Sequence, residues 1–174
     1  MTAAPKADLV QATTPAQLDD VRQLMRDFIA WSRVAQADNL DLIDSYFDAA
    51  AYERSLGKLP GYFGPPKGSL VVAYVDGRPA GCVAMRPLGE DGVCEMKRMY
   101  IADDFRGQGL GRVLADRIIA DARAAGYRAM RLETSVKQPD AIRLYERSGF
   151  VRIEPYNPMP AAMEGWLLAF ELGL

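Results

Sequence analysis

Histidine is absent from the 174-residue chain, and cysteine occurs only at Cys82 and Cys94. The missing histidines remove the usual base for catalysis near neutral pH and the commonest metal ligand. Two cysteines are too few for a disulfide framework or a cysteine-based zinc site, so we expect no metal. Chemistry in this protein must therefore rest on Tyr, Asp, Glu, Lys, Arg, Cys, Ser or Thr.

Long hydrophobic runs and a surplus of positive charge are also missing. No apolar stretch is long enough to span a bilayer, and the N-terminal MTAAPKADLV lacks the hydrophobic core of a signal peptide. We therefore expect a cytoplasmic protein with no membrane partner. The formal net charge is -2. Since binding to a phosphate backbone needs a cationic surplus, we expect no nucleic-acid partner.

The remaining composition indicates an ordinary globular protein. Hydrophobic residues make up 49% and charged residues 25% of the chain. A folded chain of this length buries roughly 70% of its extended surface, which is enough for a substantial core. The length fits one domain, expected over residues 1–174.

Two helices are expected in the N-terminal third. The first begins in TTPAQLDDVRQLMRDFIAWS, where Thr14 is a good N-cap, Pro15 suits the first helical position and Gln17 completes a capping box. The second is expected in LDLIDSYFDAAAYERSLG, residues 40–57, and ends at Gly57. Helical spacing predicts that this second helix has one face made of Ile43, Phe47, Ala50 and Arg54.

The rest of the chain alternates strands and helices. Strands are expected in SLVVAYV, AGCVAMRPL, VCEMKRMYI, RAMRLET, FVRI and GWLLAFEL. The first two form a hairpin at Asp76-Gly77. A helix with the core face Leu110, Leu114, Ile118 and Ala122 ends at Gly126, and a shorter one runs from Pro139 to Gly149. Two helices, an antiparallel meander and a strand–helix–strand–helix–strand tail indicate the α/β (α+β) class.

The stretch DDFRGQGLGRVLADRI, residues 103–118, joins a glycine loop to a helix. Unpaired N–H groups and the helix dipole make such an end suitable for a phosphate or pyrophosphate. Gly107, Gly109 and Gly111 allow close approach, and Arg106 and Arg112 add charge. The alternative is a tight turn with solvated arginines, and the loop alone does not decide between the two.

Two common nucleotide motifs do not fit this loop. A P-loop needs G-x-x-x-x-G-K-[ST], which the sequence lacks. A Rossmann fingerprint beginning at Gly107 would need glycine at the position of Arg112. The preceding antiparallel meander is also wrong for a parallel dinucleotide-binding fold.

The pattern that does fit is Arg-x-x-Gly-x-Gly at Arg106, Gly109 and Gly111, followed by AIRLYERSGF at residues 141–150, which matches A-x-x-L-Y-x-x-x-G-F. Together, in this order, the two motifs resemble the GNAT superfamily of acyl-CoA-dependent N-acyltransferases. The resemblance spans most of the chain. It implies a mixed, mostly antiparallel sheet of six to seven strands, about four flanking helices and two splayed parallel strands at the centre.

The resemblance also implies acetyl-CoA as acyl donor, with CoA as product. Its pantetheine arm would enter between the splayed strands, and its pyrophosphate would lie on the loop N–H groups. The cofactor-binding residues implied are Met99, Tyr100, Ile101, Arg106, Gly107, Gln108, Gly109, Leu110, Gly111, Arg112, Thr134, Gln138, Ala141 and Tyr145. Gln138 stands where many relatives carry asparagine, so its contact to the cofactor arm is expected to be altered or absent.

Acyl transfer to an amine requires removal of a proton from the amine, donors for the oxyanion and stabilisation of the departing thiolate. Tyr145 matches the family tyrosine that commonly acts as the acid near the thioester sulfur; otherwise it is a core aromatic beside Ile142 and Leu144. The family mode implies an oxyanion donor among the backbone N–H groups near Met99 or Tyr100.

Glu95 is the candidate general base, since some relatives place a glutamate on this strand. The alternative is an exposed strand carboxylate paired with Lys97 or an arginine of a neighbouring strand. Alternation puts Glu95, Lys97 and Met99 on one face and Arg98 and Tyr100 on the other. The family often has a β-bulge in this strand, which would exchange the two faces. The sequence therefore leaves open which of the two sets of residues faces the substrate.

An acyl-cysteine intermediate on Cys82 or Cys94 has no histidine to activate it. We expect both thiols to be small core residues and the amine to attack directly in a ternary complex.

The acceptor pocket is expected to include Tyr46, Phe47, Tyr62, Phe63, Arg98 and Tyr156. For each aromatic, local packing is an equally good explanation. Arg98, if it faces the cleft, favours a carboxylate on the acceptor. The leading prediction is an N-acetyltransferase acting on the primary amine of a small molecule or peptide, as a monomer or homodimer. The alternatives are a non-catalytic acyl-CoA-binding sensor and an unrelated nucleotide-binding domain.

Overall fold

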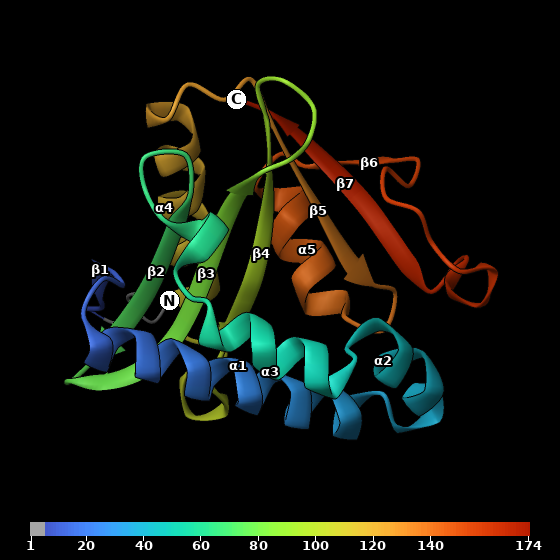
Figure 1. Ribbon diagram of the computed structural model, residues 1–174, viewed down its shortest axis with the longest axis horizontal. Coiled ribbons are helices and arrows are strands. Elements are labelled where there is room, and N and C mark those ends of the chain that lie inside the picture. Colours follow the sequence, from blue (N-terminus) through green and yellow to red (C-terminus); the bar gives the residue numbers. More distant parts are fainter. Residues whose placement is uncertain (1–5) are drawn as a thin grey trace.

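The computed structural model of the protein describes residues 6–174. Residues 1–5, the beginning of the stretch in which no signal core is found, lie outside the described residues. The chain forms one seven-stranded sheet in the order β1-β2-β3-β4-β5-β7-β6, covered by helices (Figure 1).

The strands are β1 (Asp8–Gln11), β2 (Ser69–Val75), β3 (Arg78–Pro87), β4 (Val93–Ile101), β5 (Ala129–Ser135), β6 (Val151–Ile153) and β7 (Leu167–Gly173). The helices are α1 (Pro15–Ala35), α2 (Leu40–Tyr46), α3 (Ala49–Gly57), α4 (Leu110–Ala124) and α5 (Pro139–Arg147). Short 3₁₀ turns are η1 (Ala37–Asn39), η2 (Gly61–Phe63), η3 (Asp103–Phe105) and η4 (Ala161–Met163). The expected α/β architecture is confirmed, with five helices rather than about four.

Hydrophobic residues cover both faces of the sheet. On one face α4 buries its predicted stripe of Leu110, Leu114, Ile118 and Ala122 against the strands, together with residues of α5. On the other face α1 and α3 pack through Val21, Leu24, Met25, Tyr52 and Leu56. A smaller cluster joins α2 to the segment before β7 through Ile43, Met163 and Trp166.

The first helix begins as the sequence predicts. The Thr14 side chain accepts a hydrogen bond from the Gln17 backbone N–H at 3.3 Å, and the Gln17 side chain accepts one from the Thr14 N–H at 3.1 Å. This capping box satisfies donors that the first helical turn leaves unpaired. Pro15, which has no N–H to satisfy, occupies the first position.

The prediction of one helix over 40–57 is wrong. The segment divides at Phe47, and Asp48 begins a second helix by accepting a hydrogen bond from the Ala51 N–H at 2.7 Å. The break rotates the following residues. Ala50 and Arg54, expected to share a face with Ile43, are exposed, whereas Ile43 is buried.

Strand β1 was not expected from the sequence. It is a four-residue edge strand that pairs antiparallel with β2 and is only partly buried. A segment this short, with no clear alternation of apolar and polar residues, carries little of the pattern that identifies strands.

Two irregularities in β4 shape the centre of the sheet. Cys82 pairs with Tyr100 and Ala84 with Lys97, so that two residues of β4 oppose Val83 alone. This is a β-bulge, and Arg98 within it has a φ of +59°. The parallel pairing of β4 with β5 covers only Val93, Cys94 and Glu95, after which the strands separate (Figure 1). The expected splayed parallel pair is confirmed.

Candidate active site

A groove of about 780 Å³ lies between the end of β4, the start of α4 and α5. It is lined by most of the residues predicted to bind the cofactor: Met99, Tyr100, Ile101, Arg106, Gly107, Gly109, Leu110, Gly111, Arg112, Gln138, Ala141 and Tyr145. Two predicted residues lie elsewhere. The Gln108 amide donates to the Asp104 carbonyl at 3.0 Å, and Thr134 lines an adjoining cavity.

The glycine loop leaves the start of α4 open. Gly107 and Gly109 have φ values of +72° and +83°, a backbone region that side chains with a Cβ rarely adopt. Gly109 is the N-cap and offers no side chain to the N–H groups of the first turn. A Cβ at Gly111 would lie 3.3 Å from Leu144 Cδ2, so glycine also allows α4 to approach α5 closely. The free N–H groups suit an anion.

The groove is positively charged around this helix start. Its lining contains one carboxylate, Asp140, and five cations: Arg106, Arg112, Lys137, Arg143 and Arg147. Arg106 Cζ lies 4.3 Å from the Trp31 ring centroid, and its Nε donates to the Ile101 carbonyl at 3.0 Å. This set, with the open loop, fits the diphosphate of coenzyme A.

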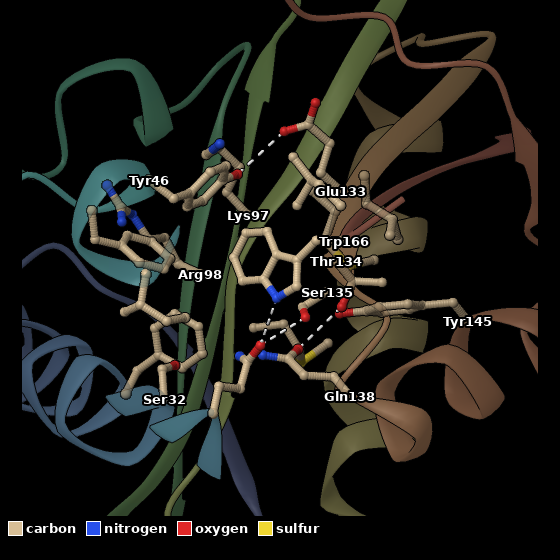
Figure 2. Close-up of a pocket in the computed structure, with 18 residues that line it drawn as sticks. Ser32, Tyr46, Lys97, Arg98, Glu133, Thr134, Ser135, Gln138, Tyr145 and Trp166 are labelled. Atoms are coloured by element: carbon tan, nitrogen blue, oxygen red, sulfur yellow. Dashed lines mark hydrogen bonds between the residues drawn. The ribbon is translucent and has the colours of Figure 1, made fainter. Parts of the chain in front are cut away.

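An inner cavity of about 100 Å³ continues from the groove into the gap between β4 and β5. The two spaces share Phe28, Met99, Gln138 and Tyr145. Tyr145 enters from α5 opposite Tyr46, Lys97 and Arg98 (Figure 2). Burial raises the pKa of Tyr145 above that of a free phenol, so the residue stays protonated.

The polar residues around the inner cavity form ordered pairs. Thr134 Oγ1 donates to Gln138 Oε1 at 3.1 Å, which joins two predicted cofactor residues (Figure 2). Gln36 Oε1 accepts from Ser135 Oγ at 2.8 Å and from Trp166 Nε1 at 3.2 Å. This second group was not predicted, because its members come from three distant parts of the chain.

An outer cavity of about 450 Å³ opens beside the inner one. The two share Tyr46, Phe47, Lys97, Arg98, Glu133 and Leu167. Residues of α3 and of the loop before β7 complete its wall, among them Tyr52, Ser55, Asn157, Met159 and Met163. The inner cavity, which Tyr145 lines, therefore shares residues with both the outer cavity and the groove.

Glu133 is the carboxylate that lines both cavities. It accepts hydrogen bonds from Tyr46 Oη at 3.2 Å and from Asn157 Nδ2 at 3.1 Å. The sequence analysis missed Glu133. The available signal was the alternation of RAMRLET, which puts Glu133 on the face opposite Leu132, combined with the expected splay of the strands.

Glu95 lies beneath the cavities and lines neither of them. Its side chain is 1% exposed and is held by Arg86, whose Nε and Nη2 lie 2.9 and 2.8 Å from Oε2. Oε1 accepts from Tyr156 Oη at 2.9 Å and lies 3.7 Å from Lys97 Nζ. Glu95 thus meets both of the partners that the sequence suggested for a structural carboxylate.

The pKa values of the neighbouring groups follow from burial. Burial lowers the pKa of Lys97, and the nearby Glu95 opposes this shift. Burial, reinforced by Glu133, raises the pKa of Tyr46, while burial and Glu95 raise that of Tyr156. Both phenols therefore stay protonated and donate to the carboxylates.

The bulge in β4 determines which residues of this strand lie on the same face of the sheet, a point that the sequence left open. Lys97 and Tyr100 pair with Ala84 and Cys82, whose side chains belong to the core beneath α1 and α3. The bulged Arg98 turns to the same side, with its Cζ 4.5 Å from the Tyr52 ring centroid. Alternation alone, which separates Lys97 from Arg98 and Tyr100, is wrong here.

The predicted acceptor aromatics divide into two groups. Tyr46 and Phe47 line the inner and outer cavities. Tyr62 is 80% exposed, Phe63 is buried in the core with α1 and α3, and Tyr156 lies behind Glu95. None of these last three lines either cavity.

Cys82 and Cys94 are buried free thiols. Burial raises the pKa of each to about 12. Within residues 6–174, no cluster of three or more Cys, Asp or Glu side chains could hold a metal ion. In the same range, no helix has the length and apolar character that a bilayer span requires.

The model of the acetyltransferase (GNAT) family matches residues 23–150. An uncharacterized N-acetyltransferase of Schizosaccharomyces pombe is 36% identical over 149 residues, 84% of this chain and 85% of that protein. N-acetylaspartate synthetase of Danio rerio is 34% identical over 113 residues, 64% of this chain and 40% of that protein.

Solved structures share the fold. The PaiA N-acetyltransferase of Thermoplasma acidophilum, in complex with coenzyme A, aligns with a TM-score of 0.74 at 14% identity, over 97% of this chain and 99% of that one. The family model, the relatives and the fold agree with the groove described above. The chain therefore belongs to the GNAT family and is an acetyl-CoA-dependent N-acetyltransferase.

Proposed function

We propose that this enzyme transfers the acetyl group directly to a primary amine in a ternary complex, with Tyr145 at the junction of the two substrates. One observation carries the proposal: Tyr145 lines both the groove and the inner cavity, and the inner cavity in turn adjoins the outer one. A groove and an acceptor cavity that share one buried residue suit two substrates bound together, because holding both reactants in place removes much of the barrier.

Acetyl-CoA, when bound, supplies a thioester carbonyl at this junction. The N–H groups that follow Gly109, together with Arg106 and Arg112, would hold the diphosphate, while Met99, Tyr100 and Ile101 would bind the pantetheine arm through their backbone. A bulge leaves backbone groups without a strand partner, so an N–H near Met99 would be the donor for the oxyanion.

The protein must also move protons. We assign acceptance of the ammonium proton to Glu133, because its carboxylate lines both acceptor cavities. As the amine nitrogen bonds to the carbonyl carbon and the carbon–sulfur bond breaks, Tyr145 donates its hydrogen bond to the departing sulfur. Glu95, the base that the sequence predicted, reaches the cavity only through Lys97 and Asn157, and we assign it a positioning role.

A small-molecule acceptor is the expected class. The outer cavity is about 450 Å³, which lies within the usual range for small ligands. The name of the relative N-acetylaspartate synthetase also concerns a small N-acetylated product. One domain over residues 1–174 and a monomer or homodimer remain predictions.

Initial-rate kinetics test the proposal. With acetyl-CoA and a panel of small amines varied together, thiol release should give intersecting reciprocal plots, and parallel plots would instead indicate an acyl-enzyme. Glu133→Gln should lower kcat by ~10²–10⁴ at neutral pH with the fold retained. The matched control is Glu154→Gln, which changes an exposed glutamate outside the cavities. Unchanged turnover in Glu133→Gln would remove this residue from proton transfer.

A further inference from the structure

We propose that the acceptor is a free amino acid, whose carboxylate is bound by Arg98 and Lys97 and whose amine is directed to Glu133. This inference rests on the proposed function and specifies its substrate class. It is carried by the charge arrangement that the β4 bulge creates in the outer cavity.

The bulge brings two consecutive cations to one cavity. In a regular strand Lys97 and Arg98 would point to opposite faces. Here Arg98 and Met99 together oppose Val83, and the regular alternation is interrupted directly after Lys97. The side chains of Lys97 and Arg98 therefore both line the inner and outer cavities. Arg98 adopts a φ of +59°, a strained region for a residue with a Cβ. Strain of this kind is retained where the orientation of a side chain matters.

Arg98 has few partners for a half-buried guanidinium. Its Nε is buried without a hydrogen-bond partner, and its Nη2 makes one long contact of 3.4 Å to Ser55 Oγ. Over residues 6–174 no carboxylate oxygen lies within 4.0 Å of its nitrogens. Its guanidinium also lies near two aromatic rings, with Cζ 4.5 Å from the Tyr52 ring centroid and 6.0 Å from that of Phe63. Buried charges are normally paired, so this guanidinium calls for an anion.

Lys97 adds a second positive group beside Arg98. Among the described residues 6–174, Glu95 is the one carboxylate within 4.0 Å of Lys97, at 3.7 Å, and it already holds Arg86 in closer contacts of 2.8 and 2.9 Å. Glu95 therefore neutralises Arg86 first and leaves Lys97 partly uncompensated. Two adjacent cations with spare donors match the two oxygens of a carboxylate.

The opposite charge lies on the neighbouring strand. Glu133 of β5 lines the same two cavities as Lys97 and Arg98, and it is held by Tyr46 and Asn157 rather than by a cation. Figure 2 shows Glu133 joined to Tyr46 by a hydrogen bond at the upper end of the view. An ammonium group is attracted to Glu133 while a carboxylate is attracted to Arg98. The cavity thus matches a zwitterion better than a simple alkylamine.

The test compares amines that differ only in the carboxylate. A panel of free L-amino acids is assayed beside the α-carboxamide and the decarboxylated amine of each, with acetyl-CoA saturating. For the wild type, the best amino acid should exceed its own carboxamide by about 10-fold to 100-fold in kcat/KM. Arg98→Met should abolish this preference by lowering kcat/KM for the amino acid at least 10-fold more than kcat/KM for its carboxamide. Arg54→Met, an exposed arginine of α3, is the matched control and should keep the wild-type preference.

Binding to the enzyme–CoA complex is measured in parallel by calorimetry, so that slow turnover does not leave the proposal undecided. The amino acid should bind at least 10-fold more tightly than its carboxamide, and Arg98→Met should remove the difference. Turnover and binding without any carboxylate preference would overturn the inference and leave the proposed function intact. A preference that survives in Arg98→Met would overturn the assignment of Arg98. Parallel kinetic plots would contradict the ternary complex instead.

Discussion

The donor groove and the inner acceptor cavity are both lined by Tyr145, but the donor and acceptor regions are built differently. The groove is formed mainly by two short continuous segments, 99–112 and 137–147, with Phe28 and Trp31 of α1, and it combines the open backbone of a glycine loop with cationic side chains. The acceptor cavities combine side chains from α2, α3, a bulge of β4, the end of β5 and the loop before β7. A backbone site is encoded locally, whereas a side-chain site depends on how distant segments pack.

This difference can be tested first where the two regions join. Tyr145→Phe removes only the hydroxyl and should lower kcat by ~10²–10⁴, with acetyl-CoA affinity little changed. The phenol is buried at the junction and its raised pKa keeps it protonated as a donor. Steady-state rates of thiol release, together with calorimetry of CoA binding, measure the two quantities.

Tyr127→Phe is the matched control, since that hydroxyl donates to the Lys67 carbonyl at 2.7 Å outside both regions. Wild-type turnover in Tyr145→Phe would mean that the thiolate departs without help. Tyr145 would then line the groove and the inner cavity without taking part in the reaction.

A second change should affect the groove alone. Gly109→Val forces a β-branched residue to a φ of +83°, at a cost of roughly 1–3 kcal/mol. The loop would relax and its N–H groups would turn away, so the Kd for CoA should rise by about 10-fold to 100-fold. Acceptor binding, measured with the amine alone, should stay within twofold of the wild type.

Gly89→Val provides the control, because Gly89 has open space around its Cβ position and no positive φ. Equal CoA affinity in Gly109→Val and the wild type would show that side chains, and not the loop backbone, hold the diphosphate.

The same contrast explains which parts could be predicted. The two motifs around Gly109 and Tyr145 are local, and the groove lies where the sequence indicated. Arg98 was recognised, but its orientation depends on a bulge opposite Val83, which no periodicity of β4 reveals. Glu133 was missed because its strand alternates like any half-buried strand. The helix break at Phe47 had one usable signal, since Asp48 is a favourable N-cap.

A third test compares two glutamates of the acceptor region, Glu95 and Glu133, to separate a positioning role from proton transfer. Glu95→Gln removes the charge that pairs with Arg86 and should destabilise the fold by about 1–3 kcal/mol. The effect on kcat should be smaller than that of Glu133→Gln, because Glu95 lines neither cavity. Urea unfolding and turnover of both variants give the comparison. If Glu95→Gln loses more turnover than Glu133→Gln at unchanged stability, the two assignments must be exchanged.

The smallest expected effect concerns the cysteines, which belong to neither region. Burial raises the pKa of both thiols from 9.0 to about 12, so few thiolates exist in the folded protein at pH 8. Cys82→Ala and Cys94→Ala should therefore keep wild-type turnover, and a thiol reagent at pH 8 should label the protein only after denaturation.

The raised pKa also predicts a pH effect with a definite sign. Above pH 9 the unfolded chain releases thiol protons that the folded chain retains, so the free energy of unfolding should fall between pH 9 and 12. In a double Cys82→Ala, Cys94→Ala variant this part of the decline should be absent. Mass spectrometry after incubation with acetyl-CoA alone should find no acetylated cysteine. An acyl adduct on either thiol would show a covalent acyl-enzyme route and would contradict direct transfer in a ternary complex.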